Sequence, residues 1–491
     1  MITLTTAEIA ALTGGRLSTT ADPDTAITSV TTDSRAVQPG ALFVAKPGEH
    51  SDGHLFISGA LASGATLILA ERETASEDGR VDPAVLVPDV VAALGALAHH
   101  VVARVREAGG LRVVGITGSA GKTTTKDLLA AILETQGPTV KPFNSYNGEI
   151  GLPLTVFEMT EDTEFLVAEM GATHVGNIDY LARMVEPEVG AVLMVGTAHV
   201  GEFGGVENIV LTKGELVEAL PSTGTAVLNA DDAQVWGMRP RTEAAVLAFG
   251  EGQAAADGVR ATDVSVDTDG HPRLTLNFPG TENAADGASF PIVSGLIGRH
   301  HVGNVLAAAA SAFALGVAPA AIAAALGGLG PTSRFRMERS ERADGVSVIN
   351  DAYNANPESM MAALQTLAAL GRPDQDGQAR RTWAVLGEML ELGEDRIHEH
   401  DRLGRLVVRM NISQTLVVGQ GAKPAYNAAV MEGSWGDEAK FVETLDQAFE
   451  DLQERLQPGD IVLFKSSNGS GLRLLGERVA HALDTNHTEE A

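Results

Sequence analysis

The chain has 491 residues, of which 44% are hydrophobic and 20% charged, and its formal net charge is −29. This length suggests about three domains of about 100–200 residues each. The acidic excess repels phosphate backbones and argues against nucleic acid as a partner. The sequence contains no cysteine, which excludes disulfides, thiolate metal sites and a cysteine nucleophile.

The first part of the chain mixes short strand patterns with helical patterns. Strands are expected at Ala26–Thr31, Ala41–Ala45 and Ala65–Leu69, and a helix at Asp89–Glu107. The pair Gly109-Gly110 follows that helix as a C-cap and marks a boundary. We therefore predict an N-terminal α/β domain over residues 1–108.

From residue 109 onward, apolar runs of strand length alternate with helical patterns. This alternation is typical of a parallel sheet covered by helices on both faces. The expected strands are Leu111–Ile116, Phe165–Glu169, Val189–Val195 and Thr225–Asn229. In Val259–Phe278, apolar and polar residues alternate around Thr268-Asp269-Gly270, which predicts an antiparallel hairpin attached to the sheet. Pro331 marks the next boundary, so the central domain is predicted at 109–330.

The stretch Val305–Gly330 carries no charge and has the length of a membrane span. It consists mostly of Ala and Gly, which insert weakly, and Gly316 and Pro319 interrupt it. Two short buried helices fit better. The first ten residues also lack the basic and apolar regions of a signal peptide, so the sequence predicts a soluble, cytoplasmic protein without membrane insertion.

Residues 331–491 again alternate strands and helices. Strands are expected at Val346–Asn350, Thr382–Leu386, Thr415–Gly419 and Asp460–Phe464. The pattern predicts a Rossmann-like C-terminal domain, but its first strand lacks the Gly-x-Gly-x-x-Gly fingerprint of a dinucleotide site.

A glycine-rich segment, Gly118-Ser119-Ala120-Gly121-Lys122-Thr123-Thr124, stands between a strand and a helix that runs to about Gln136. In a P-loop, backbone N–H groups cradle phosphates, the lysine neutralises the β and γ oxygens, and the hydroxyl after it meets Mg²⁺. Ile116 occupies the place of the first glycine of the general pattern, so the loop is a variant. A plain glycine turn before a helix is the alternative.

Two residues follow strands at the edge where this loop lies. Glu169 ends one apolar strand and precedes Gly171, and His199 comes just after the next. Ligands of open α/β sheets bind at this carboxyl edge, which makes both residues candidates for Mg²⁺. The alternatives are a hydrated carboxylate at a strand end and a structural histidine.

Lys213 falls on the apolar stripe of the helix expected from Val206 to Leu220, four residues after Ile209 and four before Val217. A lysine there must snorkel, pair or lose its charge, because desolvation lowers its pKa. A neutral amine can add CO₂ and become a carbamate, an oxygen ligand for Mg²⁺. Periodicity leaves the carbamate and the snorkelling lysine equally open.

Along essentially its whole length, the sequence resembles the bacterial Mur ligase family. The segments that carry the resemblance are DSRAVQPGALFVAKPGEHSDGH, TGSAGKTTTK, NSYNGEIGLPLT, AEMGATHVGNI, GTAHVGEFGG, TKGEL, NADD, GRHHVGN, INDAYNANPESM, LGEMLELG and KSSNGSG. The loop variant is typical of the family, and DAYNANP is typical of its dipeptide-adding member.

The resemblance implies a function and a set of roles. The expected reaction joins D-alanyl-D-alanine to UDP-MurNAc-tripeptide with ATP and two Mg²⁺ ions, in the synthesis of peptidoglycan for the cell wall, cell shape and cell division. Lys122, Glu169, His199 and Lys213 would be catalytic, and the metal ligands would be Thr123, Glu169, His199 and the carbamate of Lys213. ATP would contact Thr117, Gly118, Ser119, Ala120, Gly121, Lys122, Thr123, Asn304, Arg336 and Asp351. The N-terminal domain would bind the UDP-sugar substrate, with Ser34 and Arg35 at the uridine nucleotide. Asn147 would contact substrate, and Asn354 and Asn356 would lie near the dipeptide.

Two positions depart from the family pattern: His301 and Gly148 stand where asparagine is common. A second adenine contact is therefore not assigned, and only Asn147 is assigned to substrate in its segment. The competing functions are a sister ligase, such as a folylpolyglutamate synthase, and a P-loop switch or scaffold. The DNPR-type motif of the diaminopimelate- or lysine-adding sister is absent. A monomer is expected.

Overall fold

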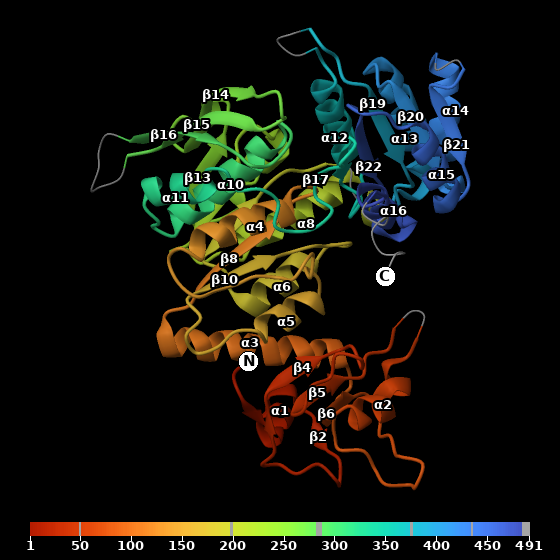
Figure 1. Cartoon of the computed structure of the whole chain (residues 1–491). Coiled ribbons are helices and arrows are strands. Elements are labelled where there is room, and N and C mark those ends of the chain that lie inside the picture. The colour runs from red at the N-terminus through yellow and green to blue at the C-terminus, as the bar shows by residue number, and fades with distance from the viewer. Residues whose placement is uncertain (49–50, 197–199, 281–286, 374–376, 434–435, 484–491) are drawn as a thin grey trace.

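A computed structural model describes residues 1–48, 51–196, 200–280, 287–373, 377–433 and 436–483. It shows a three-domain α/β fold in which each domain has its own main sheet, as predicted. The predicted domain limits at residues 108 and 330 fall between these sheets and remain predictions. In Figure 1 the N-terminal domain lies below the central domain, and the third domain lies beside it.

The N-terminal domain has a five-stranded sheet in the order β2-β7-β6-β5-β4, parallel except where β2 meets β7. The strands of this sheet are β2 (Arg16–Leu17), β4 (Ser29–Thr31), β5 (Ala41–Val44), β6 (Ala65–Ala70) and β7 (Ala84–Leu86). Two further strands, β1 (Leu4–Thr5) and β3 (Ala26–Ile27), form a separate antiparallel pair. Its helices are α1 (Thr6–Thr13), α2 (Ile57–Ala62) and α3 (Val90–Gly109). Asp89 caps α3, and buried residues of α3 share one core with α5 and α6 of the central domain.

The central sheet has nine strands in the order β16-β15-β14-β13-β12-β11-β8-β10-β9. They are β8 (Arg112–Thr117), β9 (Thr139–Val140), β10 (Phe165–Glu169), β11 (Val189–Val192), β12 (Thr225–Asn229), β13 (Ala245–Gly250), β14 (Val259–Val266), β15 (Pro272–Phe278) and β16 (Ala288–Val293). The sheet is parallel from β9 to β14, and β15 and β16 add antiparallel. The predicted hairpin is thus confirmed as β14 and β15.

Helices cover both faces of this sheet. They are α4 (Lys122–Leu133), α5 (Gly151–Val156), α6 (Asn177–Val185), α7 (Val200–Phe203), α8 (Val206–Glu218), α9 (Ala233–Trp236), α10 (His301–Ala314) and α11 (Pro319–Leu326). One core contains α4, α10 and α11, and the other contains α3, α5, α6 and α8. The uncharged stretch forms α10 and α11, as expected, and no described helix is long and apolar enough to cross a membrane.

The third domain has six strands in the order β17-β18-β22-β19-β20-β21, parallel except between β17 and β18. They are β17 (Glu338–Glu341), β18 (Ser347–Asn350), β19 (Thr382–Leu386), β20 (Gln414–Val418), β21 (Ala439–Val442) and β22 (Ile461–Lys465). Its helices are α12 (Pro357–Leu370), α13 (Arg396–Arg409), α14 (Lys423–Glu432), α15 (Leu445–Arg455) and α16 (Leu472–Ala480). The cores on the two faces contain α12 with α13 and α15 with α16.

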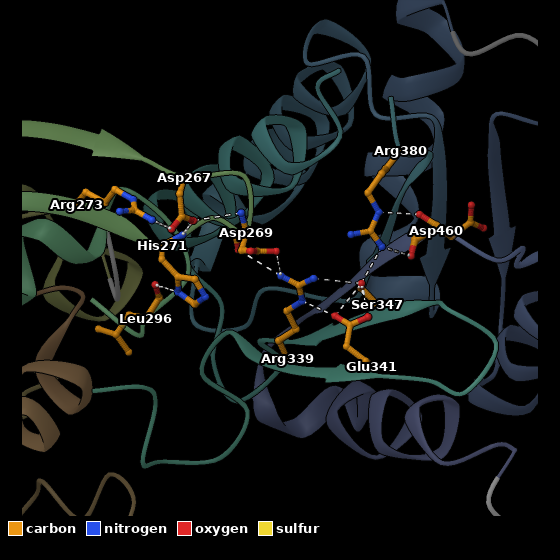
Figure 2. A network of polar contacts seen from close by, with 11 residues as sticks. Asp267, Asp269, His271, Arg273, Leu296, Arg339, Glu341, Ser347, Arg380 and Asp460 are labelled. Carbon is orange, nitrogen blue, oxygen red and sulfur yellow. Dashed lines mark hydrogen bonds and ion pairs between the residues drawn. The ribbon is translucent and has the colours of Figure 1, made fainter. Parts of the chain in front are cut away.

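The tip of the β14–β15 hairpin meets this third domain (Figure 2). Arg339 on β17 donates to the carbonyl oxygen of Asp269 at 3.3 Å and also bonds Glu341 at 2.6 Å. Gly270, at φ +89°, leaves no room for a side chain, because a Cβ there would lie 3.0 Å from Leu370 on α12. The hairpin tip therefore contacts the third domain at β17 and α12.

Candidate functional site

The predicted phosphate loop joins β8 to α4 at the carboxyl edge of the central sheet. Thr117 donates to the carbonyl oxygen of Met170 on the neighbouring segment at 2.9 Å, and the N–H of Ser119 donates to Met194 at 3.0 Å. The Lys122 ammonium donates to the carbonyl oxygen of Gly118 at 2.8 Å, so the loop closes around its own lysine. Ala120 and the rest of the loop line a cleft of about 780 Å³.

Gly121 allows the loop to pass under Asn304. It has φ +85°, a conformation that favours glycine, and a Cβ there would lie 2.3 Å from Oδ1 of Asn304. The same Oδ1 accepts a 3.4 Å hydrogen bond from Thr125, and Nδ2 of Asn304 donates to Nδ1 of His301 at 3.0 Å. The asparagine predicted to meet adenine therefore lies directly on the phosphate loop.

Glu169 and Thr123 lie together at the start of α4. The Glu169 side chain is buried, and its Oε1 accepts from Thr123 at 3.2 Å and from the amide of Asn147 at 2.7 Å. Its Oε2 is buried and has no hydrogen-bond partner within the part of the chain that the structure describes. A bare carboxylate oxygen beside a hydroxyl is a donor set that suits Mg²⁺, which prefers oxygen ligands. Thr123 and Glu169 therefore fit the predicted metal.

These oxygens do not form a complete metal cage. Among the described residues, no group of three or more His, Asp or Glu side chains is arranged to hold a metal ion. Mg²⁺ commonly binds through one or two protein oxygens together with substrate phosphates and water. The arrangement therefore fits an ion that arrives with a nucleotide.

Arg336 reaches this group from the third domain. Its Nη2 donates to Thr123 at 3.3 Å and to Ser145 at 3.1 Å, and its guanidinium lies 4.4 Å from the centre of the Tyr353 ring. The residues on both sides of it, Phe335 and Met337, have φ of +61° and +53°. Such strain in non-glycine residues is often found at functional sites.

Asp351, which follows β18, is held from two sides. Its Oδ1 accepts from the N–H of Met337 at 3.1 Å, and its Oδ2 accepts from the ammonium of Lys465 at 2.5 Å. Lys465 ends β22 and is buried. Arg336 and Asp351 thus line the same cleft as the phosphate loop, where the resemblance expects them.

Lys213 is buried on α8, as the apolar stripe predicts, with 5% of its surface exposed. Burial and the neighbouring charge of Lys122 lower the pKa of Lys213 to about 7. Burial likewise lowers the pKa of Lys122, and Glu169 opposes that change. A large share of the Lys213 amine is therefore neutral near pH 7. His199, the other predicted ligand, lies outside the described residues.

The remaining predicted contacts occupy two places. Asn147, Asn354 and Asn356 line the cleft, although the side chain of Asn356 also caps α12 by accepting from Ser359 at 2.9 Å. Ser34 and Arg35 lie in the N-terminal domain and not among the residues lining this cleft. Arg35 is largely exposed and pairs with Asp33 at 2.8 Å.

Three residues at or near this cleft have no role predicted from the sequence: Lys465, Lys126 and Ser145. Lys465 had a usable signal, because it ends an apolar strand at the carboxyl edge just as Glu169 does. Lys126 and Ser145 had none. Their contacts join segments that are 16 to 22 residues apart and follow from the path of a loop.

A phosphate loop with an oxygen ligand set, faced by an arginine and an aspartate from another α/β domain, is the arrangement expected of a nucleotide-dependent phosphoryl-transfer site. Three family models match this chain: the Mur ligase middle domain at residues 116–312, the Mur ligase glutamate ligase domain at 335–468, and the Mur ligase family catalytic domain at 26–102. The chain belongs to the Mur ligase family.

Individual relatives align with this chain along nearly its whole length. The UDP-N-acetylmuramoyl-tripeptide–D-alanyl-D-alanine ligase of Mycobacterium tuberculosis is 44% identical, with 96% of each chain covered. The Escherichia coli enzyme of that name is 31% identical, with 99% of this chain and 100% of its own covered. A crystal structure of MurF from Acinetobacter baumannii has a TM-score of 0.83 at 30% identity and covers 98% and 99% of the two chains. MurF ligase from Thermotoga maritima, in complex with ADP, has a TM-score of 0.75 at 28% identity and covers 93% and 98%.

Proposed function

We propose that this chain is the ATP-dependent ligase that joins D-alanyl-D-alanine to UDP-MurNAc-tripeptide in the synthesis of the peptidoglycan precursor. The observation that carries the proposal is the convergence of Lys122, Thr123 and Glu169 with Arg336 and Asp351 on one cleft. That convergence occurs in a chain that is 44% identical, over 96% of its length, to a ligase named for this reaction.

The chemistry requires activation of a carboxylate, because its negative charge repels a nucleophile. A carboxylate oxygen of the tripeptide attacks the γ-phosphorus of ATP, and the bond from that phosphorus to the bridging oxygen breaks, which releases ADP. The amine of the dipeptide then attacks the acyl carbon of the acyl phosphate, loses a proton and expels inorganic phosphate. One amide bond forms for each ATP consumed.

The residues of the cleft have separate parts in this scheme. Lys122 and the loop N–H groups bind the phosphates, and Arg336 adds positive charge from the opposite side. Thr123 and Glu169 would hold one Mg²⁺, and His199 with a carbamate on Lys213 would hold a second; bound Mg²⁺ would screen the charge of the phosphates. Asn304 would contact the base. Much of the rate would come from positioning three substrates together.

Ser34 and Arg35 would bind the uridine nucleotide in the N-terminal domain, and Asn147, Asn354 and Asn356 would contact the peptide parts. The acting unit would be a monomer. We expect the reaction in the cytoplasm, where ATP is available.

The test is an assay of ADP release with purified protein, ATP, Mg²⁺ and UDP-MurNAc-tripeptide, with and without D-alanyl-D-alanine. The proposal predicts ADP release that depends on the dipeptide and a sugar-nucleotide product carrying five residues. ADP release at the same rate with and without the dipeptide would instead support the alternative of a nucleotide switch.

A further inference from the structure

Two lysines beside the cleft are buried and bind main-chain oxygens of loops. Lys126, on α4, is 1% exposed and donates to the carbonyl oxygens of Pro142 and Asn144 at 3.0 Å each. Lys465, at the end of β22, is 2% exposed and donates to the carbonyl oxygens of Asp351 at 3.3 Å and Asn354 at 3.1 Å. Each lysine also meets one carboxylate, at 2.9 Å for Lys126 and 2.5 Å for Lys465.

An ammonium group has three hydrogens to donate, and each of these lysines has three oxygens within reach. The positions of the loops are therefore fixed relative to a rigid strand or helix. Burying a charge in this way is costly unless it is fully paired, and an apolar residue would pack at lower cost. Packing alone is therefore a poor explanation for lysine at these two positions.

The two anchored loops belong to different domains: one follows β9 of the central sheet and the other follows β18 of the third sheet. The loop held by Lys126 carries Ser145 and Asn147, which contact Thr123 and Glu169. The loop held by Lys465 carries Asn354, whose side chain is exposed and lines the cleft. Lys465 also lines the cleft, but its three ammonium hydrogens are matched by the oxygens of Asp351 and Asn354.

We propose that Lys465 is a positioning residue for the incoming amine: it fixes the loop 351–356 so that Asn354 faces the dipeptide, while Lys126 fixes the loop 142–147 on the side of the tripeptide. The proposal rests on the function proposed above. Asp351 also accepts a hydrogen bond from the N–H of Met337 at 3.1 Å, a contact that does not involve Lys465. Loss of Lys465 should therefore affect the dipeptide far more than ATP.

The experiment compares Lys465→Met with the matched variant Lys126→Met, since methionine keeps an unbranched apolar stem. For Lys465→Met we expect the KM for D-alanyl-D-alanine to rise by about tenfold or more, which corresponds to about 1.4 kcal/mol of binding free energy. Its KM for ATP should change by less than about threefold, a difference below about 0.7 kcal/mol on the same scale. Lys126→Met should instead raise the KM for UDP-MurNAc-tripeptide more than the KM for D-alanyl-D-alanine.

A second assay replaces the dipeptide with hydroxylamine, a small amine that needs no loop to recognise it and traps the acyl phosphate as a hydroxamate. Lys465→Met should keep most of its hydroxamate formation while losing ligation of the dipeptide. Lys465→Arg keeps the charge, so its KM for D-alanyl-D-alanine should lie between those of the wild type and Lys465→Met.

Some outcomes would overturn the proposal. An unchanged dipeptide KM in folded Lys465→Met would do so, as would equal changes in all three KM values together with a lower melting temperature. If Lys465→Met does not fold, Asn354→Ala takes its place with the lysine intact, and an unchanged dipeptide KM there contradicts the proposal. Failure of the proposed function is distinct, because wild-type protein would then show no ADP release dependent on the dipeptide.

Discussion

Arg336 of the third domain donates a hydrogen bond to the hydroxyl of Thr123 on the phosphate loop, across 213 residues of sequence. The same Nη2 donates to Ser145, and the guanidinium stacks over Tyr353. One side chain thus joins the phosphate loop, the loop after β9 and the segment after β18. We infer that Arg336 helps to hold the third domain closed over bound nucleotide.

Arg336→Met tests this role, because methionine keeps the apolar stem and removes the guanidinium. We expect turnover to fall by about 10²- to 10³-fold, the scale for loss of one preorganised charge-stabilising donor. Small-angle scattering should show that ATP analogue and sugar nucleotide together compact the wild type more than the variant. Arg339→Met is the control, since Arg339 also joins the two domains but only at the hairpin tip (Figure 2). Equal effects of the two variants would contradict the role of Arg336.

Gly121→Ala should weaken ATP binding through its collision with Asn304. A Cβ there lies 2.3 Å from Oδ1 of Asn304, and φ is +85°. Backbone strain of this kind costs about 1–3 kcal/mol. Gly316→Ala is the matched control, because Gly316 has φ +83° and nothing within 4 Å. Both variants should melt at lower temperature, and only Gly121→Ala should raise the KM for ATP. A raised KM in both would assign the effect to general strain.

Glu169→Gln should change the need for Mg²⁺. The variant keeps the shape of the side chain but replaces the bare, buried Oε2 with an amide that binds metal poorly. We expect the Mg²⁺ concentration for half-maximal rate to rise by about 10- to 100-fold, the scale for disturbing a metal site. The melting temperature without Mg²⁺ should stay close to that of the wild type, because the amide keeps the shape of the side chain and an oxygen that can accept from Thr123 and Asn147. A wild-type Mg²⁺ titration curve would remove Glu169 from the metal site.

Variants of Lys213 distinguish a carbamate from a snorkelling lysine, the two states that the helical periodicity leaves equally open. A carbamate acts through carboxylate oxygens, so Lys213→Met should lose activity by orders of magnitude, and Lys213→Ala should regain part of it with a short carboxylic acid. Wild-type protein depleted of CO₂ should be slow and recover with bicarbonate, since a pKa of about 7 leaves enough neutral amine to react. A snorkelling lysine predicts that folded Lys213→Met is active and about equally stable.

The sequence predicted features that depend on local patterns. The apolar runs placed β10 and β12 at Phe165–Glu169 and Thr225–Asn229, and the apolar stripe of α8 correctly predicted that Lys213 is buried. Strand β13 was missed, although it is part of the parallel sheet. Its first two residues, Ala245 and Val246, are exposed, so the segment lacks the fully buried pattern of its neighbours.

Contacts between distant segments could not be predicted in the same way. That Asp351 is paired with Lys465 depends on β18 and β22 being neighbours, which the order of strands along the chain does not reveal. The hydrogen bond from Arg336 to Thr123 could not be predicted either, because it depends on how two domains face each other. Only the resemblance to a family placed Arg336 and Asp351 at the nucleotide, and it left Lys465 unassigned.

The most direct test of the central claim follows the fate of one oxygen atom. UDP-MurNAc-tripeptide labelled with ¹⁸O in the reacting carboxylate is incubated with the protein, ATP, Mg²⁺ and D-alanyl-D-alanine, and the products are analysed by mass spectrometry. The account predicts a sugar nucleotide carrying five residues and inorganic phosphate with one ¹⁸O atom, because the carboxylate oxygen that attacks phosphorus leaves with it. Unlabelled phosphate, or ADP without a lengthened peptide, would contradict ligation through an acyl phosphate.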